Sequence, residues 1–219
     1  MTYSIVALDR ATGHFGVAAA TFHLAVGSLV PHARAGIGAL ATQATTNPYY
    51  GPRGLELLAA GAPAETVVRR LIEADEGRDH RQVHVVDRQG RAAAWTGPAT
   101  EGVTGHLVRD GYSIAGNKLR GESVLEAMDR AYRDGSDLPF AERLLTAVVA
   151  GEAAGGDKRG RQSAAILVAG SEDYPLIDFR VDNHPAPLDE LRAILALSAG
   201  EHYLSFRAQL PTRARPHNH

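Results

Sequence analysis

Tight turns between short apolar segments limit the folds open to this chain more than any other feature. Asp110-Gly111 is a two-residue hairpin turn, and the sequence RQGR at 88–91 has similar turn chemistry. A third turn runs from Asp9 to Gly13, between the first two apolar segments. Hairpins make antiparallel strand pairs, so the sequence predicts sheets that are mostly antiparallel.

The predicted elements alternate between blocks of strands and pairs of helices. The expected strands are 3–8, 14–20, 36–45, 81–87, 92–95, 103–109, 112–115, 163–169 and 176–181. The expected helices are 52–60, 63–74, 119–133, 138–150 and 187–197, whereas 21–34 shows no clear pattern. A helix pair can cover one face of a sheet while the other face meets a second sheet. This order predicts an α+β fold, a four-layer αββα sandwich with two stacked sheets between helix layers. A single-sheet α+β sandwich is the alternative.

Composition excludes several classes of protein. The chain has 219 residues, of which 44% are hydrophobic, and a formal charge of −2, which gives no strong attraction to nucleic acid or anionic membranes. It has no cysteine, which excludes disulfide bonds, thiolate catalysis and cysteine-ligated zinc. No apolar segment approaches the ~20 residues of a membrane span. No signal peptide is evident. We expect a cytoplasmic protein with one domain over 1–208 and a mobile polar tail over 209–219.

The first candidate site residue is Thr2, which follows the initiator Met1 and precedes a buried strand. If Met1 is removed, the Thr2 hydroxyl lies beside a free α-amine, which puts a nucleophile and a base on one residue. The alternative is that Thr2 simply begins a strand, which β-branched residues favour. Ser4 shares the strand face of Thr2 and is either a supporting residue, a substitute nucleophile or part of the core.

Asn117 and the glycine-rich segment 155–163 supply further candidates. Asn117 is expected between a strand and a helix, where its amide either donates to a developing oxyanion or caps the helix. The segment 155–163 lacks the Lys-Ser or Lys-Thr of a phosphate-binding P-loop, so ATP chemistry is not expected. We expect it to bind an anion, with Arg159 clamping a substrate carboxylate and Asp157 either orienting an amine or pairing with Arg159. Gln162 and Ser163 complete this group; the alternative is a solvated turn with an internal salt bridge.

Polar residues in and after the third strand are candidates for substrate binding. Gln43, Asn47 and Arg53 need partners that a pocket would supply, or they form hydrogen bonds between loop and sheet. His80 and His84 are four residues apart, which is about 13 Å along a strand, so they do not chelate one metal together. The sequence therefore predicts no metal site.

Several segments together resemble the domain-of-unknown-function family 1028, a group of N-terminal-nucleophile (Ntn) hydrolase-like proteins. The most specific are NPYYGPRGL and GGDKRGRQSAA, and the resemblance runs from about residue 2 to about residue 197. The segment TFHLAVGS departs from the family, which has a small or polar residue nearer Thr21. Membership implies the four-layer αββα fold and suggests hydrolysis of an amide bond.

These residues and the resemblance predict a small-molecule amidohydrolase. Thr2 is the expected nucleophile, Asn117 the oxyanion donor, and Arg159, with Arg53 in reserve, the group that holds a small polar or acidic substrate. We expect no cofactor, no nucleic-acid partner and no membrane partner. We do expect the protein to form a homo-oligomer. The alternative is a binding module for an anionic metabolite on the same fold, without catalysis.

Overall fold

The computed structural model describes residues 2–218 and contains two antiparallel sheets. The larger sheet has the strand order β10-β9-β2-β1-β8-β7, and the smaller has the order β3-β4-β5-β6. The strands of the larger sheet are β1 (Thr2–Asp9), β2 (His14–Thr21), β7 (Val103–Arg109), β8 (Tyr112–Leu119), β9 (Ser163–Ala169) and β10 (Ile177–Val181). The strands of the smaller sheet are β3 (Pro31–Arg34), β4 (Gly38–Ala44), β5 (Arg81–Asp87) and β6 (Ala92–Thr96).

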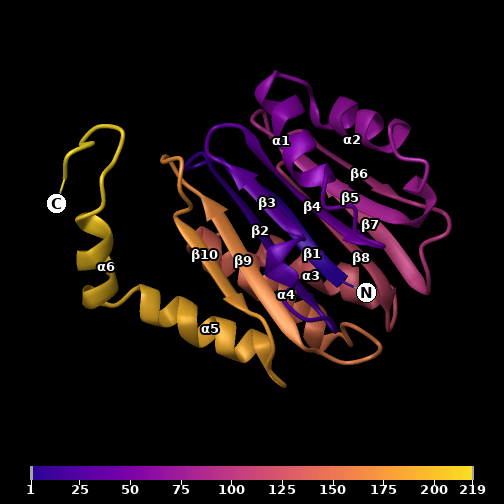
Figure 1. Ribbon diagram of the computed structural model, residues 1–219. Coiled ribbons are helices and arrows are strands. Elements are labelled where there is room, and N and C mark those ends of the chain that lie inside the picture. Colours follow the sequence, from indigo (N-terminus) through magenta and orange to yellow (C-terminus); the bar gives the residue numbers. More distant parts are fainter. Residues whose placement is uncertain (1, 219) are drawn as a thin grey trace.

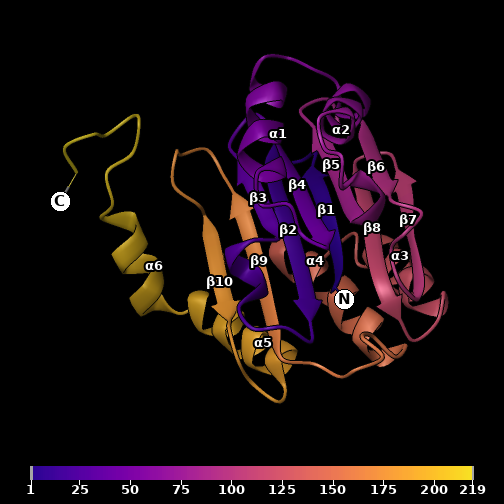
Figure 2. The same cartoon turned by 45° about the vertical axis from the view of Figure 1, so that its right-hand side comes forward.

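Within residues 2–218, six α-helices lie on the outer faces of the two sheets or beyond them (Figures 1 and 2). They are α1 (Tyr50–Ala59), α2 (Ala64–Glu73), α3 (Ser123–Asp134), α4 (Phe140–Ala153), α5 (Pro187–Ser198) and α6 (Glu201–Ala208). Two short 3-10 helices, η1 (Val26–Ser28) and η2 (Arg78–His80), lie in connecting segments.

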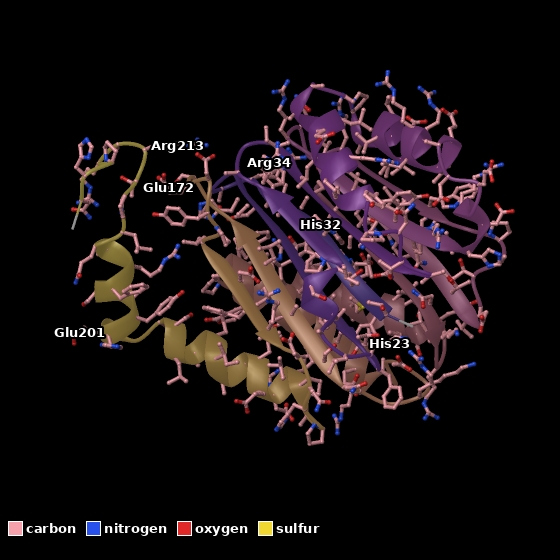
Figure 3. The ribbon with its side chains drawn as sticks, viewed as in Figure 1. His23, His32, Arg34, Glu172, Glu201 and Arg213 are labelled. Carbon is pink, nitrogen blue, oxygen red and sulfur yellow. The ribbon has the colours of Figure 1, made fainter. Side chains whose placement is uncertain are left out.

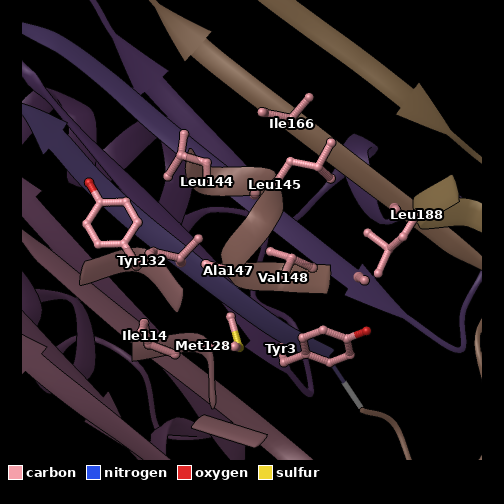
Figure 4. Packing of buried hydrophobic residues seen from close by; sticks show 14 of the residues in the cluster. Tyr3, Ile114, Met128, Tyr132, Leu144, Leu145, Ala147, Val148, Ile166 and Leu188 are labelled. Atoms are coloured by element: carbon pink, nitrogen blue, oxygen red, sulfur yellow. The ribbon is translucent and has the colours of Figure 1, made fainter. Parts of the chain in front are cut away.

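The strand β1 shows how the sequence separates the layers. Tyr3, Ile5 and Ala7 alternate along β1 and join the apolar core beneath α3 and α4, where Tyr3 lies near Met128 (Figure 4). Thr2 and Ser4 alternate with them and lie on the face turned toward the smaller sheet. The two-residue period of one strand thus assigns an apolar face to the helices and a partly polar face to the space between the sheets.

The smaller sheet also has one face covered by helices and one face turned toward the other sheet. Leu40, Val83 and Val85 pack against α1 and α2, whose apolar faces cover the outside of the sheet (Figure 1). A second cluster, which contains Val6 and Val86, fills the space between the two sheets. The layers are therefore helices, sheet, sheet and helices, as predicted, and the single-sheet alternative is excluded.

Most predicted elements are present, and the main differences concern three places. The ambiguous segment contains η1 and the edge strand β3, and a helix that was not predicted, α6, follows α5. The strand β8 continues to Leu119 and α3 begins only at Ser123, so the prediction that a helix begins at Leu119 was wrong. Asn117 therefore lies within a strand, paired with Thr2, and does not cap a helix.

Candidate functional site

Thr2 begins the strand β1, which lies inside the larger sheet between β2 and β8. It is paired with Thr21 on one side and with Asn117 on the other. Its side chain is 6% exposed, and its Oγ1 donates a hydrogen bond of 3.3 Å to Thr21 Oγ1. Thr2 also borders a pocket of about 340 Å³. The hydroxyl predicted to be the nucleophile is therefore held in place at the edge of a pocket. Met1, whose removal the prediction requires, lies outside the described residues.

Two side-chain amides hold the backbone of Thr2. Asn117 Nδ2 and Gln43 Nε2 each donate a hydrogen bond of 3.3 Å to the Thr2 carbonyl oxygen. The same two amides donate to Gln82 Oε1, over 3.0 Å from Asn117 and 2.7 Å from Gln43. All three amides are at least 99% buried. A buried polar group is costly unless it is paired, so this cluster fixes the position of the first residue of β1.

The backbone of the neighbouring strands determines the orientation of Gln82. Its Nε2 shares two hydrogens among three nearby acceptors, the carbonyl oxygens of Gly116 and Gly105, at 2.9 and 3.0 Å, and Thr96 Oγ1, at 2.8 Å. Because the nitrogen must face these carbonyls, the oxygen of Gln82 faces Gln43 and Asn117. Sequence reasoning did not identify Gln82, although it alternates with valines in QVHVV and so lies on one face of β5 with His84.

Ser4 and His84 extend the same buried cluster. Ser4 Oγ donates to Gln43 Oε1 over 2.6 Å and lies 2.8 Å from His84 Nε2, and His84 Nδ1 lies 3.1 Å from the Ser113 carbonyl oxygen. Both side chains are fully buried, and burial lowers the pKa of His84 to about 3. Neither side chain borders the two pockets near Thr2, so in the described chain this serine and histidine lie behind Thr2.

A second pocket, of about 230 Å³, adjoins the first, and His23 and Ala44 border both. Figure 3 shows His23 beside the end of the layers at which β1 begins. Burial, together with the nearby Arg159 guanidinium, lowers the pKa of His23. Asn117 and Lys118 border the second pocket. Thr2 and its cross-strand partner Asn117 therefore lie at two adjoining pockets.

Backbone conformation also marks this region. Among the described residues, three that are not glycine have a positive φ: Ala25 at 53°, Ala44 at 72° and Lys118 at 50°. All three border the two pockets. Left-handed backbone is unfavourable for residues with a Cβ, and such residues gather at functional sites.

The predicted anion-binding segment forms an internal ion pair. Asp157 is 4% exposed and accepts hydrogen bonds from the backbone N–H of Phe22, over 3.0 Å, and of Arg159, over 2.8 Å. It also pairs with the Arg159 guanidinium, with 3.1 Å between the closest atoms. Arg159 NH1 lies 3.4 Å from His23 Nε2, so this arginine reaches the rim of the two pockets. The structure thus shows the pairing that was one of the two roles considered for Asp157.

Ser163 and Gln162 form hydrogen bonds with the segments that surround this rim. Ser163 Oγ donates to the His23 carbonyl oxygen over 2.6 Å and accepts from the Val26 N–H over 3.0 Å, so it holds the loop that borders the larger pocket. The backbone N–H of Gln162 donates to the Thr21 carbonyl oxygen, and its side chain donates to Asn183. Both residues lie near the site, but neither borders the two pockets.

Asn47 and Arg53 lie apart from this group. Asn47 donates to Asp75 Oδ2 over 2.9 Å, and although burial opposes ionisation, hydrogen bonds from Asn47 and Arg81 lower the pKa of Asp75. Arg53 is exposed on α1, where it stacks on Tyr49 at 5.2 Å and borders a separate pocket between α1 and α2. The structure therefore does not bring Arg53 to Thr2.

Two kinds of feature were not found in the described part of the chain, a metal site and a membrane-spanning helix. Among residues 2–218, no group of three or more histidine, aspartate or glutamate side chains is arranged to hold a metal ion. In the same part of the chain, no helix combines the length and the apolar character that crossing a membrane requires.

Comparison with known proteins gives the family of the chain. A family model described as a family of unknown function, DUF1028, matches residues 2–191. The crystal structure of protein SPO2555 from Silicibacter pomeroyi, whose description names the same family model, is 34% identical; the match covers 99% of this chain and 98% of that one, with a TM-score of 0.92. Anbu (ancestral beta-subunit) from Yersinia bercovieri is 15% identical over 95% of this chain and 98% of that one, with a TM-score of 0.39. No curated protein matches the chain. The family model and the 34% identical structure, each matched over most of the chain, show that this protein belongs to the DUF1028 family.

Proposed function

We propose that this protein is an amidohydrolase of the Ntn type, which cleaves the C–N bond of a small polar or acidic amide. The observation that carries the proposal is the placement of Thr2. Thr2 borders a pocket at the start of a strand inside the sheet, and two buried amides hold its carbonyl. A nucleophile gains most from such rigid placement, because the reacting atoms are then aligned before the substrate arrives.

The reaction requires that Met1 be removed, so that Thr2 carries the α-amine. An unperturbed α-amine has a pKa near 8, so about a tenth or more of it is neutral at pH 7 and accepts the hydroxyl proton. Thr2 Oγ1 then adds to the substrate carbonyl carbon, and the C–N bond breaks as the amine leaves with a proton. The acyl group remains as an ester on Thr2. Water hydrolyses this ester, which releases the carboxylic acid and restores the hydroxyl.

The neighbouring polar groups have assigned roles in this proposal. In the resting protein Asn117 donates one N–H to the Thr2 carbonyl over 3.3 Å, which is the longer of its two hydrogen bonds. During the reaction this N–H turns to donate to the developing oxyanion of the substrate. Arg159 holds the acidic part of the substrate at the rim beside His23, and Asp157 positions Arg159 through their ion pair. Gln43 and Gln82 act as positioning residues behind Thr2.

The experiment combines intact mass measurement with two substitutions of one residue. We expect a mass that corresponds to a chain beginning at Thr2. Thr2→Ala abolishes turnover on a panel of small amides, whereas Thr2→Ser, which keeps a hydroxyl, retains part of it. The proposal is contradicted if the purified protein keeps Met1 and the Thr2→Ala variant hydrolyses amides as well as the unmodified protein does.

A non-catalytic binding module on the same fold is the second candidate. The observation that favours it is that both hydrogens of the Asn117 amide already have acceptors, so no donor of that side chain is free for an oxyanion in the resting protein. A retained Met1, thermal stabilisation by an anionic metabolite and no turnover would select this candidate.

A further inference from the structure

The two pockets beside Thr2 and Asn117 differ in chemistry. The larger one, of about 340 Å³, has space for roughly eleven water-sized groups, taking ~30 Å³ for each. The smaller one, of about 230 Å³, has space for roughly eight on the same basis. A small molecule that occupied both would place its middle near the Thr2–Asn117 strand pair, where the proposed reaction takes place.

The larger pocket is bordered by an apolar loop. Leu24, Val26, Leu29 and Val30 contribute aliphatic side chains to it. Leu24 is 64% exposed and Leu29 is 50% exposed, so these large apolar side chains lie at an open mouth and not in the core. Exposed apolar groups that gather around a pocket indicate a site for an apolar ligand group.

The smaller pocket is bordered by groups that form hydrogen bonds. Thr100 borders this pocket, and its Oγ1 is buried and has no hydrogen-bond partner among the described residues. Lys118 Nζ pairs with Glu101 at 2.8 Å, but the Glu101 side chain is 76% exposed. An ion pair with such an exposed partner stabilises the protein little, so Lys118 can transfer to a ligand carboxylate at low cost.

We infer that the ligand of this site is an N-acylated amino acid or a close relative: an amide with an apolar acyl group on one side and a carboxylate on the other. The acyl chain lies in the larger pocket against Leu29, and the carboxylate lies in the smaller pocket near Lys118 and Thr100. Arg159, which contacts His23 at the rim of the same pocket, adds a second positive charge for the carboxylate. The amide then lies at Thr2 and Asn117. This inference rests on the proposed function for the reaction, but the binding that it describes does not require turnover.

Binding to the full chain with Thr2→Ala tests the inference without hydrolysis. Calorimetric titration with acetylglycine, butyrylglycine and hexanoylglycine should show an affinity that rises about fourfold for each added methylene, the equivalent of ~0.8 kcal/mol of apolar burial. Hexanoylglycine methyl ester, which lacks the negative charge, should bind about tenfold more weakly than hexanoylglycine, as expected for the loss of a charge-assisted hydrogen bond of about 1.5 kcal/mol.

Matched substitutions in the same background separate the two pockets. Lys118→Gln should weaken hexanoylglycine about tenfold and leave its methyl ester unchanged, whereas Lys158→Gln, at an exposed lysine nearby, should change neither. Leu29→Ser should remove the dependence on acyl length, whereas Leu204→Ser, at a leucine of similar exposure on α6, should not. Equal affinity for all acyl lengths, or for the acid and its ester, overturns the inference.

Turnover by the unmodified chain distinguishes this inference from the proposed function. Hydrolysis at Thr2 of amides that lack a carboxylate, without binding of acylglycines, contradicts the ligand class and leaves the proposed function standing. Acylglycine binding with the predicted pattern, but without hydrolysis by a chain that begins at Thr2, supports the ligand class and contradicts the amidohydrolase.

Discussion

At the scale of single residues, a chain of hydrogen bonds behind Thr2 determines which way each amide points. The carbonyls of Gly105 and Gly116 require the nitrogen of Gln82, so Gln82 Oε1 accepts from Gln43, and Gln43 Oε1 in turn accepts from Ser4. The Ser113 carbonyl can only accept, so neutral His84 carries its ring proton on Nδ1 and its Nε2 is an acceptor. The one hydrogen of the Ser4 hydroxyl therefore lies between two acceptors, Gln43 Oε1 at 2.6 Å and His84 Nε2 at 2.8 Å. The orientations of Gln82 and Gln43 thus follow from the neighbouring carbonyls, and the tautomer of His84 follows from the Ser113 carbonyl.

His84 makes the stability of the fold sensitive to acid. Burial lowers its pKa to about 3, whereas an unfolded histidine has a pKa near 6.5. As the pH falls from about 6.5 toward about 3, the unfolded chain binds a proton that the folded chain refuses, so the free energy of unfolding decreases, by at most ~1.4 kcal/mol per pH unit from this residue. The contribution is fully present above about pH 6.5.

Urea unfolding between pH 7 and pH 4 checks this prediction. Burial also lowers the pKa values of His32 and His106, which add to the slope of stability with pH. The useful comparison is therefore with His84→Gln, which should be less stable at pH 7 but show a shallower slope. A variant with the same slope as the unmodified chain would show that His84 does not titrate as described.

Gln82 is predicted to be a positioning residue. Gln82→Met leaves the buried donors of Gln43 and Asn117 without their shared acceptor, at a cost of about 1–3 kcal/mol for each orphaned group. We expect kcat to fall with little change in KM, measured well below the melting temperature of the variant. Gln89→Met, in an exposed turn, is the control and should change stability by less than about 0.5 kcal/mol. A stability loss with unchanged kcat would limit Gln82 to a structural role.

Sequence reasoning reached only part of this cluster. Thr2 and Asn117 were predicted because each has a recognised chemical role, and the structure pairs them across two strands. Gln82 escaped because one glutamine in a strand of valines carries no chemical signature; its importance comes from the facing sheet. Arg53 and Asn47 were grouped with Gln43 by closeness in sequence, but the chain leaves the sheet after β4, and these two residues follow it to α1 and Asp75.

At the scale of elements, close packing of α4 on the larger sheet requires a glycine in β2. A Cβ at Gly16 would collide with the side chains of Leu144 and Phe140. Gly16→Ala should therefore lower the free energy of unfolding by about 1–3 kcal/mol, as overpacked cores do. Gly105→Ala is the matched control, because its Cβ would meet Leu125 at an ordinary distance of 3.6 Å. Equal denaturation midpoints for the two variants would contradict this packing.

The elements themselves were largely predictable, because strand and helix periods are local properties of the sequence. The hairpin turns at 88–91 and 110–111 fall between β5 and β6 and between β7 and β8, as predicted. The edge strand β3 was not predicted because its four residues, Pro31–Arg34, are too few to show alternation. The helix α6 was missed because it has no buried residue and hence no apolar stripe to recognise.

At the scale of the whole molecule, α6 and the segment after it lie away from the layered body (Figures 1 and 2). Their contacts include Tyr203 with Phe179, at 6.0 Å between ring centroids, and Tyr174 with the Pro211 carbonyl, at 2.8 Å. A chain that ends at Ser198 should therefore keep its fold and its activity, with a melting temperature lowered by at most about 4 °C. Loss of cooperative unfolding would show that α6 contributes to the core.

The expected homo-oligomer stays a prediction. Light scattering on the full chain and on the chain that ends at Ser198 checks it.

The central claim is that the Thr2 hydroxyl carries the acyl group during the reaction. Peptide mass spectrometry after rapid acid quenching of the protein with hexanoylglycine tests it most directly. We expect a peptide that begins at Thr2 and carries one hexanoyl group as a base-labile ester on that residue, and we expect no such ester in the Thr2→Ala variant. Turnover by a chain that keeps Met1, or an acyl group on any other residue, would contradict it.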